Sequence, residues 1–103
     1  MVSIVTPSYN CSEYIVKTIE SVLNQSYQNW EMIIVDDCST DNSIEIIERI
    51  TDGNSKIKLI KLEKNVGSAQ ARNVALEVAN GRFIAFLDSD DIWYSDKLEE
   101  QVS

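Results

Sequence analysis

Four short apolar runs recur at intervals of 25 to 29 residues along this chain of 103 residues. Each run is about as long as a β-strand, and the segments between the runs show the apolar periodicity of amphipathic helices. Strands that alternate with helices are typical of a parallel sheet with right-handed crossovers, so this spacing predicts one α/β domain. The runs are VSIVT (2–6), EMIIVD (31–36), IKLIKL (57–62) and RFIAFL (82–87).

The segments between these runs predict three helices, and a short fourth helix is expected near the end of the chain, over residues 96–102. Asn10 and Glu13 have the spacing of a capping pair for the first helix. The second helix opens in the polar cluster 39–43, and Gly81 stands where a glycine after the third helix is expected. The residues expected on the buried stripes are Tyr14, Ile15, Thr18, Ile19, Val22 and Leu23, then Ile44, Ile47 and Ile50, then Ala71, Ala75 and Val78.

The residues within the runs predict their places in the sheet. The third run carries Lys58 and Lys61, and lysine on a strand often marks an unpaired edge. The other three runs are almost continuously apolar, as expected of strands that are covered on both faces. We therefore expect a Rossmann-like three-layer α/β/α domain with a mainly parallel sheet in the strand order 3-2-1-4.

The charge and the residue types exclude several kinds of function. The net charge of -8 argues against a nucleic-acid partner, because nucleic acid requires a basic face. The chain has no histidine, which excludes Ser-His-Asp and Cys-His nucleophiles and the usual nitrogen ligands of zinc. No run approaches the roughly 18 residues of a membrane-spanning helix, and no signal peptide is expected at the start. Cys11 and Cys38 are expected to be reduced thiols of a cytoplasmic protein.

Polar residues follow each of the four runs, at positions 6–10, 36–39, 64–67 and 88–91. The turn and capping preferences of Asp, Asn and Ser account for any one of these clusters alone. However, the carboxyl ends of parallel strands meet at one edge of a sheet, and ligands of open α/β sheets bind there. The four clusters together therefore predict a binding site.

The stretch FLDSDDIW places Asp88, Asp90 and Asp91 at the end of the last run. Two like charges about 4 Å apart repel each other by roughly 4 kcal/mol at an effective dielectric constant of about 20. A hard divalent cation offsets this repulsion, and such cations are often held by one or two carboxylates together with substrate phosphates. The cluster predicts a site for a cation, Mn²⁺ or Mg²⁺, which would bridge the carboxylates and a bound diphosphate.

The blocks VSIVTPSYN, EMIIVDDCSTDNS, NVGSAQARNVAL and GRFIAFLDSDD resemble the nucleotide-binding half of family 2 glycosyltransferases, inverting enzymes of the GT-A fold. The resemblance implies that residues 1–103 are the nucleotide-sugar-binding part of a GT-A domain, a fragment that lacks the acceptor-binding half and its general base. It also implies transfer of a sugar from a nucleotide-diphosphate donor, typically a UDP-sugar, to a hydroxyl of a glycan or lipid-linked acceptor. The expected location is the cytoplasm or the cytoplasmic face of the membrane.

The resemblance further implies roles for the residues that follow the first two runs. Thr6, Pro7 and Tyr9 would line the nucleobase pocket, with the ring of Tyr9 against the base. Asp37 would accept a hydrogen bond from the base, whereas Asp36 would be structural.

The resemblance places the remaining site residues near the phosphates. Arg72 would lie beside them, although an ordinary solvated arginine of a helix is the alternative. Asp88 and Asp90 match the DXD motif of the family, with Asp88 toward the ribose and Asp90 on the metal. Asp91 would share or replace the role of Asp90.

Three other functions match parts of the pattern. A phosphoreceiver domain has an acidic pair after its first strand, where this chain has Thr-Pro-Ser. A phosphatase of the haloacid dehalogenase type carries Asp-x-Asp after its first core strand, whereas here the motif follows the fourth run. A module that binds nucleotide and metal without catalysis stays open as an alternative. A truncated sheet would also leave an apolar face or a strand edge uncovered, and this is expected to promote self-association.

Overall fold

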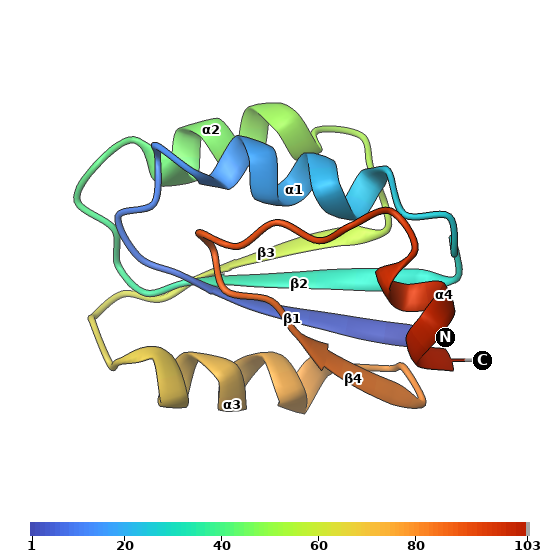
Figure 1. The fold of residues 1–103 in the computed structure, drawn as a ribbon. Coiled ribbons are helices and arrows are strands. Elements are labelled where there is room, and N and C mark those ends of the chain that lie inside the picture. The colour runs from blue at the N-terminus through green and yellow to red at the C-terminus, as the bar shows by residue number, and fades with distance from the viewer. Residues whose placement is uncertain (103) are drawn as a thin grey trace.

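A computed structural model describes residues 1–102 of the chain and shows three layers, with α1 and α2 on one face of the sheet and α3 on the other (Figure 1). The short α4 lies beside the end at which the strands begin. The α/β class and the strand–helix alternation are as predicted. The elements are β1 (Val2–Ser8), α1 (Ile15–Leu23), β2 (Trp30–Asp36), α2 (Ser43–Thr51), β3 (Ile57–Lys61), α3 (Ser68–Val78), β4 (Phe83–Phe86) and α4 (Lys97–Val102).

The four strands form one sheet in the order β3-β2-β1-β4, and every pairing is parallel. Val2 lies opposite Trp30 on one side of β1 and opposite Phe83 on the other. The predicted strand order and the edge position of β3 are confirmed. Because the strands run in one direction, the loops that follow β1, β2, β3 and β4 all leave the sheet at the same edge.

The core has one part on each face of the sheet, because alternate residues of a strand point to opposite faces. The larger part lies between the sheet and the helices α1 and α2, and the smaller part lies under α3. Alanines on the buried face of α3 let that helix approach the sheet closely. The smaller part consists of Val5, Ile33, Val35, Ala71 and Ala75.

The predicted helix stripes are correct near the middle of each helix and wrong at several ends. Tyr14 is 51% exposed because it precedes the first turn of α1. Leu23 and Val78, the last residues of their helices, are 36% and 40% exposed. Ile44 and Ile50 are half buried. Burial therefore follows the part of each helix that lies over the sheet, which helical periodicity alone does not reveal.

Gly81 acts through close packing and not as a helix terminator. The helix α3 ends at Val78, and Gly81 does not have a positive φ. A Cβ atom at this position would lie 2.5 Å from Ser3 Oγ and 2.6 Å from Ser3 N. The N–H of Gly81 donates a hydrogen bond of 2.7 Å to Ser3 Oγ. Glycine is therefore required here because the chain passes directly against β1.

The buried carboxylate of Glu31 joins several elements at this amino end of the sheet. Ser3 Oγ and the backbone N–H of Asn80 donate to Glu31 Oε2 over 2.5 and 2.6 Å. Lys58 Nζ lies 3.5 Å from Glu31 Oε1. Burial raises the pKa of Glu31, but the hydrogen bonds and the charge of Lys58 together lower it by more. The pKa therefore lies below its ordinary value of 4.5. The ionised form therefore stabilises the fold.

Glu31→Gln should lower the free energy of unfolding by about 1–3 kcal/mol at pH 7, because it weakens charge-assisted hydrogen bonds in a buried site. The stabilisation from an acid with a depressed pKa is present above pH 4.5 and is lost as the pH falls through the lower folded-state value. The free energies of unfolding of wild type and of Glu31→Gln, measured with urea, should therefore differ less at pH 3 than at pH 7. Glu45→Gln, which removes an exposed pair with Arg49, is the control and should change stability little. An equal loss for Glu31→Gln at both pH values would contradict this role.

The outer edge of β4 is uncovered. Phe83, Ile84 and Phe86 are 53%, 40% and 53% exposed, and no strand within residues 1–102 pairs with that edge. The prediction that the last run is covered on both faces is wrong, because α3 packs mainly on β1 and β2 and leaves β4 largely exposed. The expectation of an uncovered apolar edge is confirmed, and self-association through it stays a prediction.

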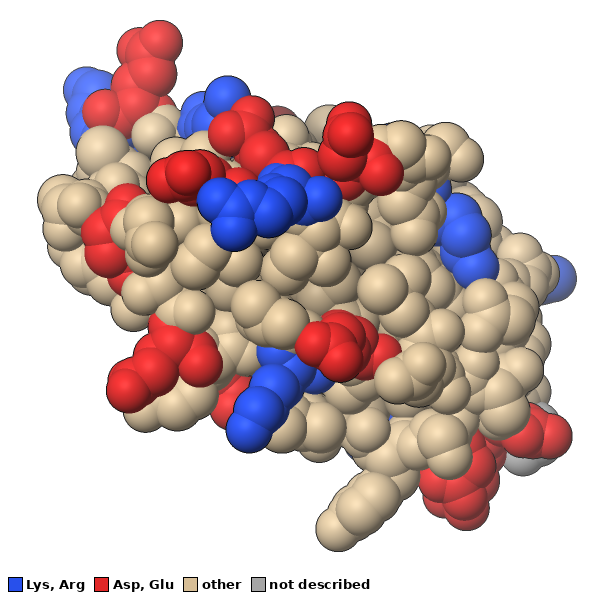
Figure 2. Space-filling model, turned by 90° about the horizontal axis from the view of Figure 1, so that it is seen from above, with Lys and Arg blue, Asp and Glu red and all other residues tan. Residues whose placement is uncertain are grey.

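Acidic and basic side chains are interspersed over the face that carries α1 and α2 (Figure 2). Two ion pairs involve α2: Glu45 with Arg49 and Glu48 with Lys61, each at 3.3 Å. Exposed pairs of this kind contribute about 0–1 kcal/mol each, so the core carries most of the stability. In the part of the chain that the structure describes, no helix has both the length and the apolar character needed to cross a membrane.

Candidate functional site

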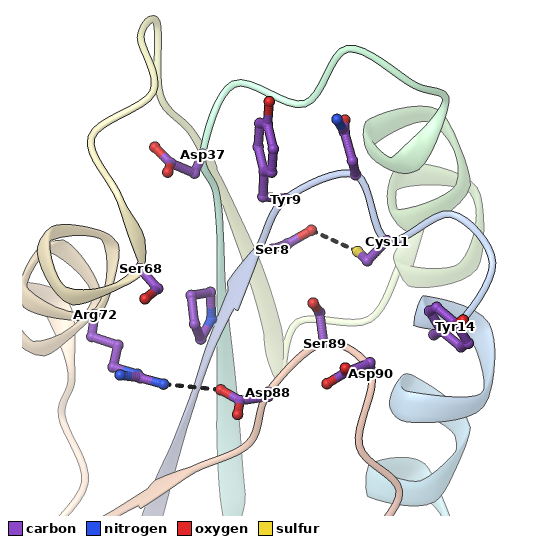
Figure 3. A pocket seen from close by; sticks show the side chains of 12 residues that line it. Ser8, Tyr9, Cys11, Tyr14, Asp37, Ser68, Arg72, Asp88, Ser89 and Asp90 are labelled. Atoms are coloured by element: carbon purple, nitrogen blue, oxygen red, sulfur yellow. Dashed lines mark hydrogen bonds and ion pairs between the residues drawn. The ribbon is translucent and has the colours of Figure 1, made fainter.

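A cleft of about 390 Å³ opens at the carboxyl edge of the sheet, between the loop that precedes α1 and the first residues of α3 (Figure 3). The loops that follow β1, β2 and β4 form its floor and walls, as the edge clusters of the sequence predict. Six of the eight predicted site residues line it: Pro7, Tyr9, Asp37, Arg72, Asp88 and Asp90.

The other two predicted residues, Thr6 and Asp91, lie next to the cleft but do not line it. Thr6 is fully buried near the end of β1, and its Oγ1 has no hydrogen-bond partner. Asp91 belongs to the same acidic cluster as Asp88 and Asp90. Thr6 is therefore not part of this lining, and its contact with a nucleobase stays a prediction.

The loop between β1 and α1 is fixed by Asn10, which has a positive φ of 47°. The side-chain oxygen of Asn10 accepts the backbone N–H groups of Thr40 and Asp41 over 2.8 and 3.3 Å. Asn10 therefore joins this loop to the loop before α2, and the prediction that it caps α1 is wrong. Tyr9, which is 49% exposed, stands in the cleft beside it.

The two aspartates at the end of β2 have separate tasks. Asp36 is fully buried and accepts the backbone N–H and the hydroxyl of Ser39 over 2.9 and 2.6 Å. Asp37 faces the cleft, and its two oxygens accept the N–H groups of Val66 and Gly67 over 2.7 and 2.8 Å. Asp36 is thus structural, as expected. A carboxylate offers about four lone-pair sites, so Asp37 keeps capacity for a ligand while it holds the loop before α3.

Arg72 on α3 reaches across the cleft. Its Nη2 lies 3.0 Å from Asp88 Oδ1, and its guanidinium lies 5.8 Å from the ring centre of Phe86. Its Nε is buried and has no hydrogen-bond partner. The side chain is therefore held at the cleft and does not extend freely into solvent, and its buried Nε–H remains available as a donor.

The acidic cluster consists of Asp88, Asp90 and Asp91, all exposed, each with a carboxylate oxygen within 4.8 Å of the others. Of these three groups, only Asp88 has an ion pair with another residue in the described range 1–102, namely with Arg72. Carboxylate oxygens are hard ligands that suit Mg²⁺ and Mn²⁺. The donor set and its spacing therefore match a divalent cation of this type.

Both cysteines lie close to the cleft as free thiols, as predicted. Cys11 is buried, lines the cleft and lies 2.9 Å from the hydroxyl of Ser8. Cys38 is half buried, and its sulfur lies 3.6 Å from the carbonyl oxygen of Glu63. Each thiol thus has its own polar partner.

Sequence reasoning did not assign six of the residues that line the cleft. Three of them lie inside the polar clusters that were expected at this edge, so only their side-chain directions were missing. The others come from the loop that leads into α1 and from the first turn of α3, and closeness to a site loop is a usable signal for them. The six residues are Ser8, Asn10, Cys11, Tyr14, Ser68 and Ser89.

A family model described as "Glycosyl transferase family 2" matches residues 3–103 of the chain. The chain belongs to glycosyltransferase family 2. TuaG of Bacillus subtilis, a glycosyltransferase named for teichuronic acid biosynthesis, is 55% identical over 102 residues, which are 99% of this chain and 40% of TuaG. WfgD of Escherichia coli, a "UDP-Glc:alpha-D-GlcNAc-diphosphoundecaprenol beta-1,3-glucosyltransferase", is 52% identical over 103 residues, 100% of this chain and 40% of that protein. The chain thus spans about 40% of the length of these relatives.

Solved structures show the same fold. Staphylococcus aureus TarS (residues 1–349), solved in complex with UDP, gives a TM-score of 0.90 at 36% identity over 98% of this chain and 30% of that one. The mannosyltransferase PcManGT of Pyrobaculum calidifontis, solved with GDP-Man and Mn²⁺, gives a TM-score of 0.83 at 28% identity. The match covers 89% of this chain and 28% of that one. The family and the GT-A fold that the four sequence blocks predict are confirmed.

Proposed function

We propose that this domain binds the nucleotide-diphosphate part of a sugar donor and that the donor is a UDP-sugar. The observation that supports this proposal most directly is the content of a single cleft. It contains the ring of Tyr9, the carboxylate of Asp37, the guanidinium of Arg72 and two carboxylates of the acidic cluster. These groups match a base at one end and a diphosphate at the other. The TarS complex with UDP and the UDP-Glc in the name of WfgD support uracil as the base.

The base end is built from the loops after β1 and β2. The ring of Tyr9 provides a flat apolar surface for the base, beside Pro7 in the lining. Asp37 accepts the N3–H of uracil at a lone pair that its bonds to Val66 and Gly67 leave free. Cytosine has no hydrogen at N3, so the same carboxylate repels it. Asp37 thus provides the preference for uracil over cytosine.

The phosphate end is formed by the acidic cluster and α3. Asp88, Asp90 and Asp91 hold a divalent cation, Mn²⁺ or Mg²⁺, and Asp88 also faces the ribose. When it is bound, this cation neutralises the negative charge of the diphosphate leaving group. Arg72 contributes a second positive charge, and its Nε is available as a donor. PcManGT, solved with GDP-Man and Mn²⁺, supports a cation at this end.

The whole reaction that we propose is transfer of the sugar, with inversion, to a hydroxyl of a glycan or lipid-linked acceptor. WfgD, whose name includes a diphosphoundecaprenol acceptor, supports a lipid-linked acceptor. In this proposal the described residues bind the donor and orient its diphosphate. The general base that deprotonates the acceptor hydroxyl is not assigned to any of them.

Calorimetry of UDP, CDP and GDP binding in the presence of Mn²⁺ tests this function. UDP should bind most tightly, and CDP should bind more weakly by about 1–3 kcal/mol because it presents an acceptor to the carboxylate of Asp37. CDP is the matched control, since its ribose and diphosphate are identical to those of UDP. Equal affinity for UDP and CDP would exclude uracil recognition, and no binding of any nucleotide would exclude the function.

A further inference from the structure

The segment that carries the acidic cluster runs along α1 and not along the sheet. After β4, the backbone forms neither helix nor strand until α4 begins at Lys97. In Figure 1 this segment is the orange-to-red trace that runs alongside α1 on its way to α4. Its backbone therefore lacks the ladder of hydrogen bonds that would fix a strand, and separate contacts hold it instead. Two of them are backbone bonds, from the N–H of Asp91 to the carbonyl of Asp88 and from the N–H of Ser26 to the carbonyl of Ser95. Side chains of α1 and of the residues just after it supply further contacts.

Thr18 of α1 supplies the anchor at the acidic cluster. This side chain is fully buried, and its Oγ1 lies 2.7 Å from the carbonyl oxygen of Asp91 and 2.9 Å from that of Ser89. The carbonyl of Tyr14, one turn earlier in the same helix, is further away at 3.3 Å. A hydroxyl has one proton, so Thr18 donates to one of these carbonyls at a time. The nearer acceptors belong to the acidic segment.

Gln25, just beyond the end of α1, holds the far end of the same segment. Its Nε2 donates to the carbonyl of Tyr94 over 2.7 Å, and its Oε1 accepts the N–H of Leu98 over 3.0 Å. Gln25 is 2% exposed. The segment is thus attached to α1 by Thr18 beside the carboxylates and by Gln25 where α4 begins.

The side chains of the acidic cluster are held less directly than their backbone. Asp88 is paired with Arg72, which lies on the opposite side of the cleft. Asp90 and Asp91 have no side-chain ion pair among the described residues. Their positions therefore depend on the backbone on which they stand. A turn bond from the N–H of Asp91 to the carbonyl of Asp88 shapes this backbone, and the hydroxyl of Thr18 ties it to α1.

We propose that Thr18 is a positioning residue for the divalent-cation site: its hydroxyl holds the backbone of Ser89 and Asp91 against α1 and so sets where the carboxylates of Asp90 and Asp91 stand. This inference rests on the proposed function, because it assigns a support to the cation site named there. Residues that orient metal ligands through hydrogen bonds typically change metal affinity by about 10–100-fold when they are replaced.

Three variants of Thr18 separate its hydroxyl from its volume. Thr18→Val keeps the branched shape but places a methyl group near the two carbonyls, whereas Thr18→Ala leaves space; both lack the donor. Thr18→Ser keeps the hydroxyl. Ser21→Ala is the matched control, because the Ser21 hydroxyl is also buried on α1 but bonds only within the helix, to the carbonyl of Thr18 over 2.7 Å.

The first measurement is the Mn²⁺ concentration that gives half of the maximal thermal stabilisation by UDP. Thr18→Val and Thr18→Ala should raise it about tenfold or more, while Thr18→Ser and Ser21→Ala should stay within about threefold of wild type. The second is hydrogen exchange of the amides of residues 89–92 without metal or nucleotide. Exchange should be faster in both variants that lack the hydroxyl and unchanged in Ser21→Ala.

Other results would overturn the inference in distinguishable ways. If the Mn²⁺ requirement rises in Thr18→Val but not in Thr18→Ala, crowding by the methyl group is the cause and the hydroxyl does not position the cluster. A wild-type Mn²⁺ requirement in both variants would exclude Thr18 while leaving the proposed function intact. If wild-type protein itself shows no dependence on Mn²⁺, the proposed function is wrong and the inference fails with it.

Discussion

Asp90→Asn is expected to weaken UDP binding strongly at Mn²⁺ concentrations that are sufficient for the wild-type protein, because a ligand of the cation is lost. Asp88 and Asp90 both belong to the acidic cluster and line the cleft, but Asp88 is paired with Arg72. The carboxylate of Asp90 is therefore the one free to bind a cation beside a bound diphosphate. Loss of this ligand should weaken cation binding by more than the about 10–100-fold that loss of a supporting hydrogen-bond partner typically costs. Without metal, the variant should be as stable as wild type or slightly more stable, because one of three mutually repelling charges is gone.

Two matched variants make this result specific. Asp91→Asn removes a charge from the same cluster but outside the cleft lining, so it should weaken cation binding less than Asp90→Asn does. Asp96→Asn makes the same chemical change just before α4, outside the cluster, and should leave binding unchanged. Calorimetric titration of UDP at several Mn²⁺ concentrations measures all three variants. If Asp90→Asn binds Mn²⁺ and UDP as wild type does, Asp90 does not hold the cation.

Asp37→Ala is expected to weaken UDP binding by about 1–3 kcal/mol, which is roughly 5–150-fold, through loss of a charge-assisted hydrogen bond to the base. The same change also frees the backbone N–H groups of Val66 and Gly67, which Asp37 accepts over 2.7 and 2.8 Å. Thermal stability should therefore fall too. Affinity for UDP alone does not distinguish base recognition from a loosened loop.

Comparison of UDP with CDP separates the two effects of Asp37→Ala. If Asp37 accepts the N3–H of uracil, the variant should lose affinity for UDP and not for CDP, and its preference between them should nearly disappear. A loosened loop would weaken both ligands by a similar factor. Unchanged UDP affinity, measured by calorimetry, would remove Asp37 from the binding site altogether.

The arrangement of the fold was predictable from the sequence because it depends on patterns that repeat along the chain. Four apolar runs separated by helical stripes specify a parallel sheet, and Lys58 and Lys61 mark β3 as an edge strand. The roles of individual polar residues were not predictable in this way. Asn10 bonds to the loop before α2, and Gly81 packs against Ser3, because chain segments distant in sequence meet there. Local preferences for caps and turns do not encode such contacts.

The candidate site was predictable to a similar degree. Strand-end clusters and the resemblance placed Tyr9, Asp37, Arg72 and the acidic cluster at one edge, and the structure brings all of these together. The pair between Arg72 and Asp88 and the bonds from Asp37 to the loop before α3 needed coordinates, since they join residues 16 to 30 positions apart. The same holds for Thr18, which the helical stripe identified only as a buried residue.

The melting temperature of the protein with UDP, in the presence of Mn²⁺ or of a chelator, tests the central claim most directly. At a UDP concentration about 100 times its Kd, binding should stabilise the fold by about 2.7 kcal/mol and raise the melting temperature by roughly 10–20 °C. This rise should occur with Mn²⁺ and be absent with chelator, because the diphosphate is otherwise repelled by Asp88, Asp90 and Asp91. Equal stabilisation with and without metal would contradict the assignment of the acidic cluster as a cation site.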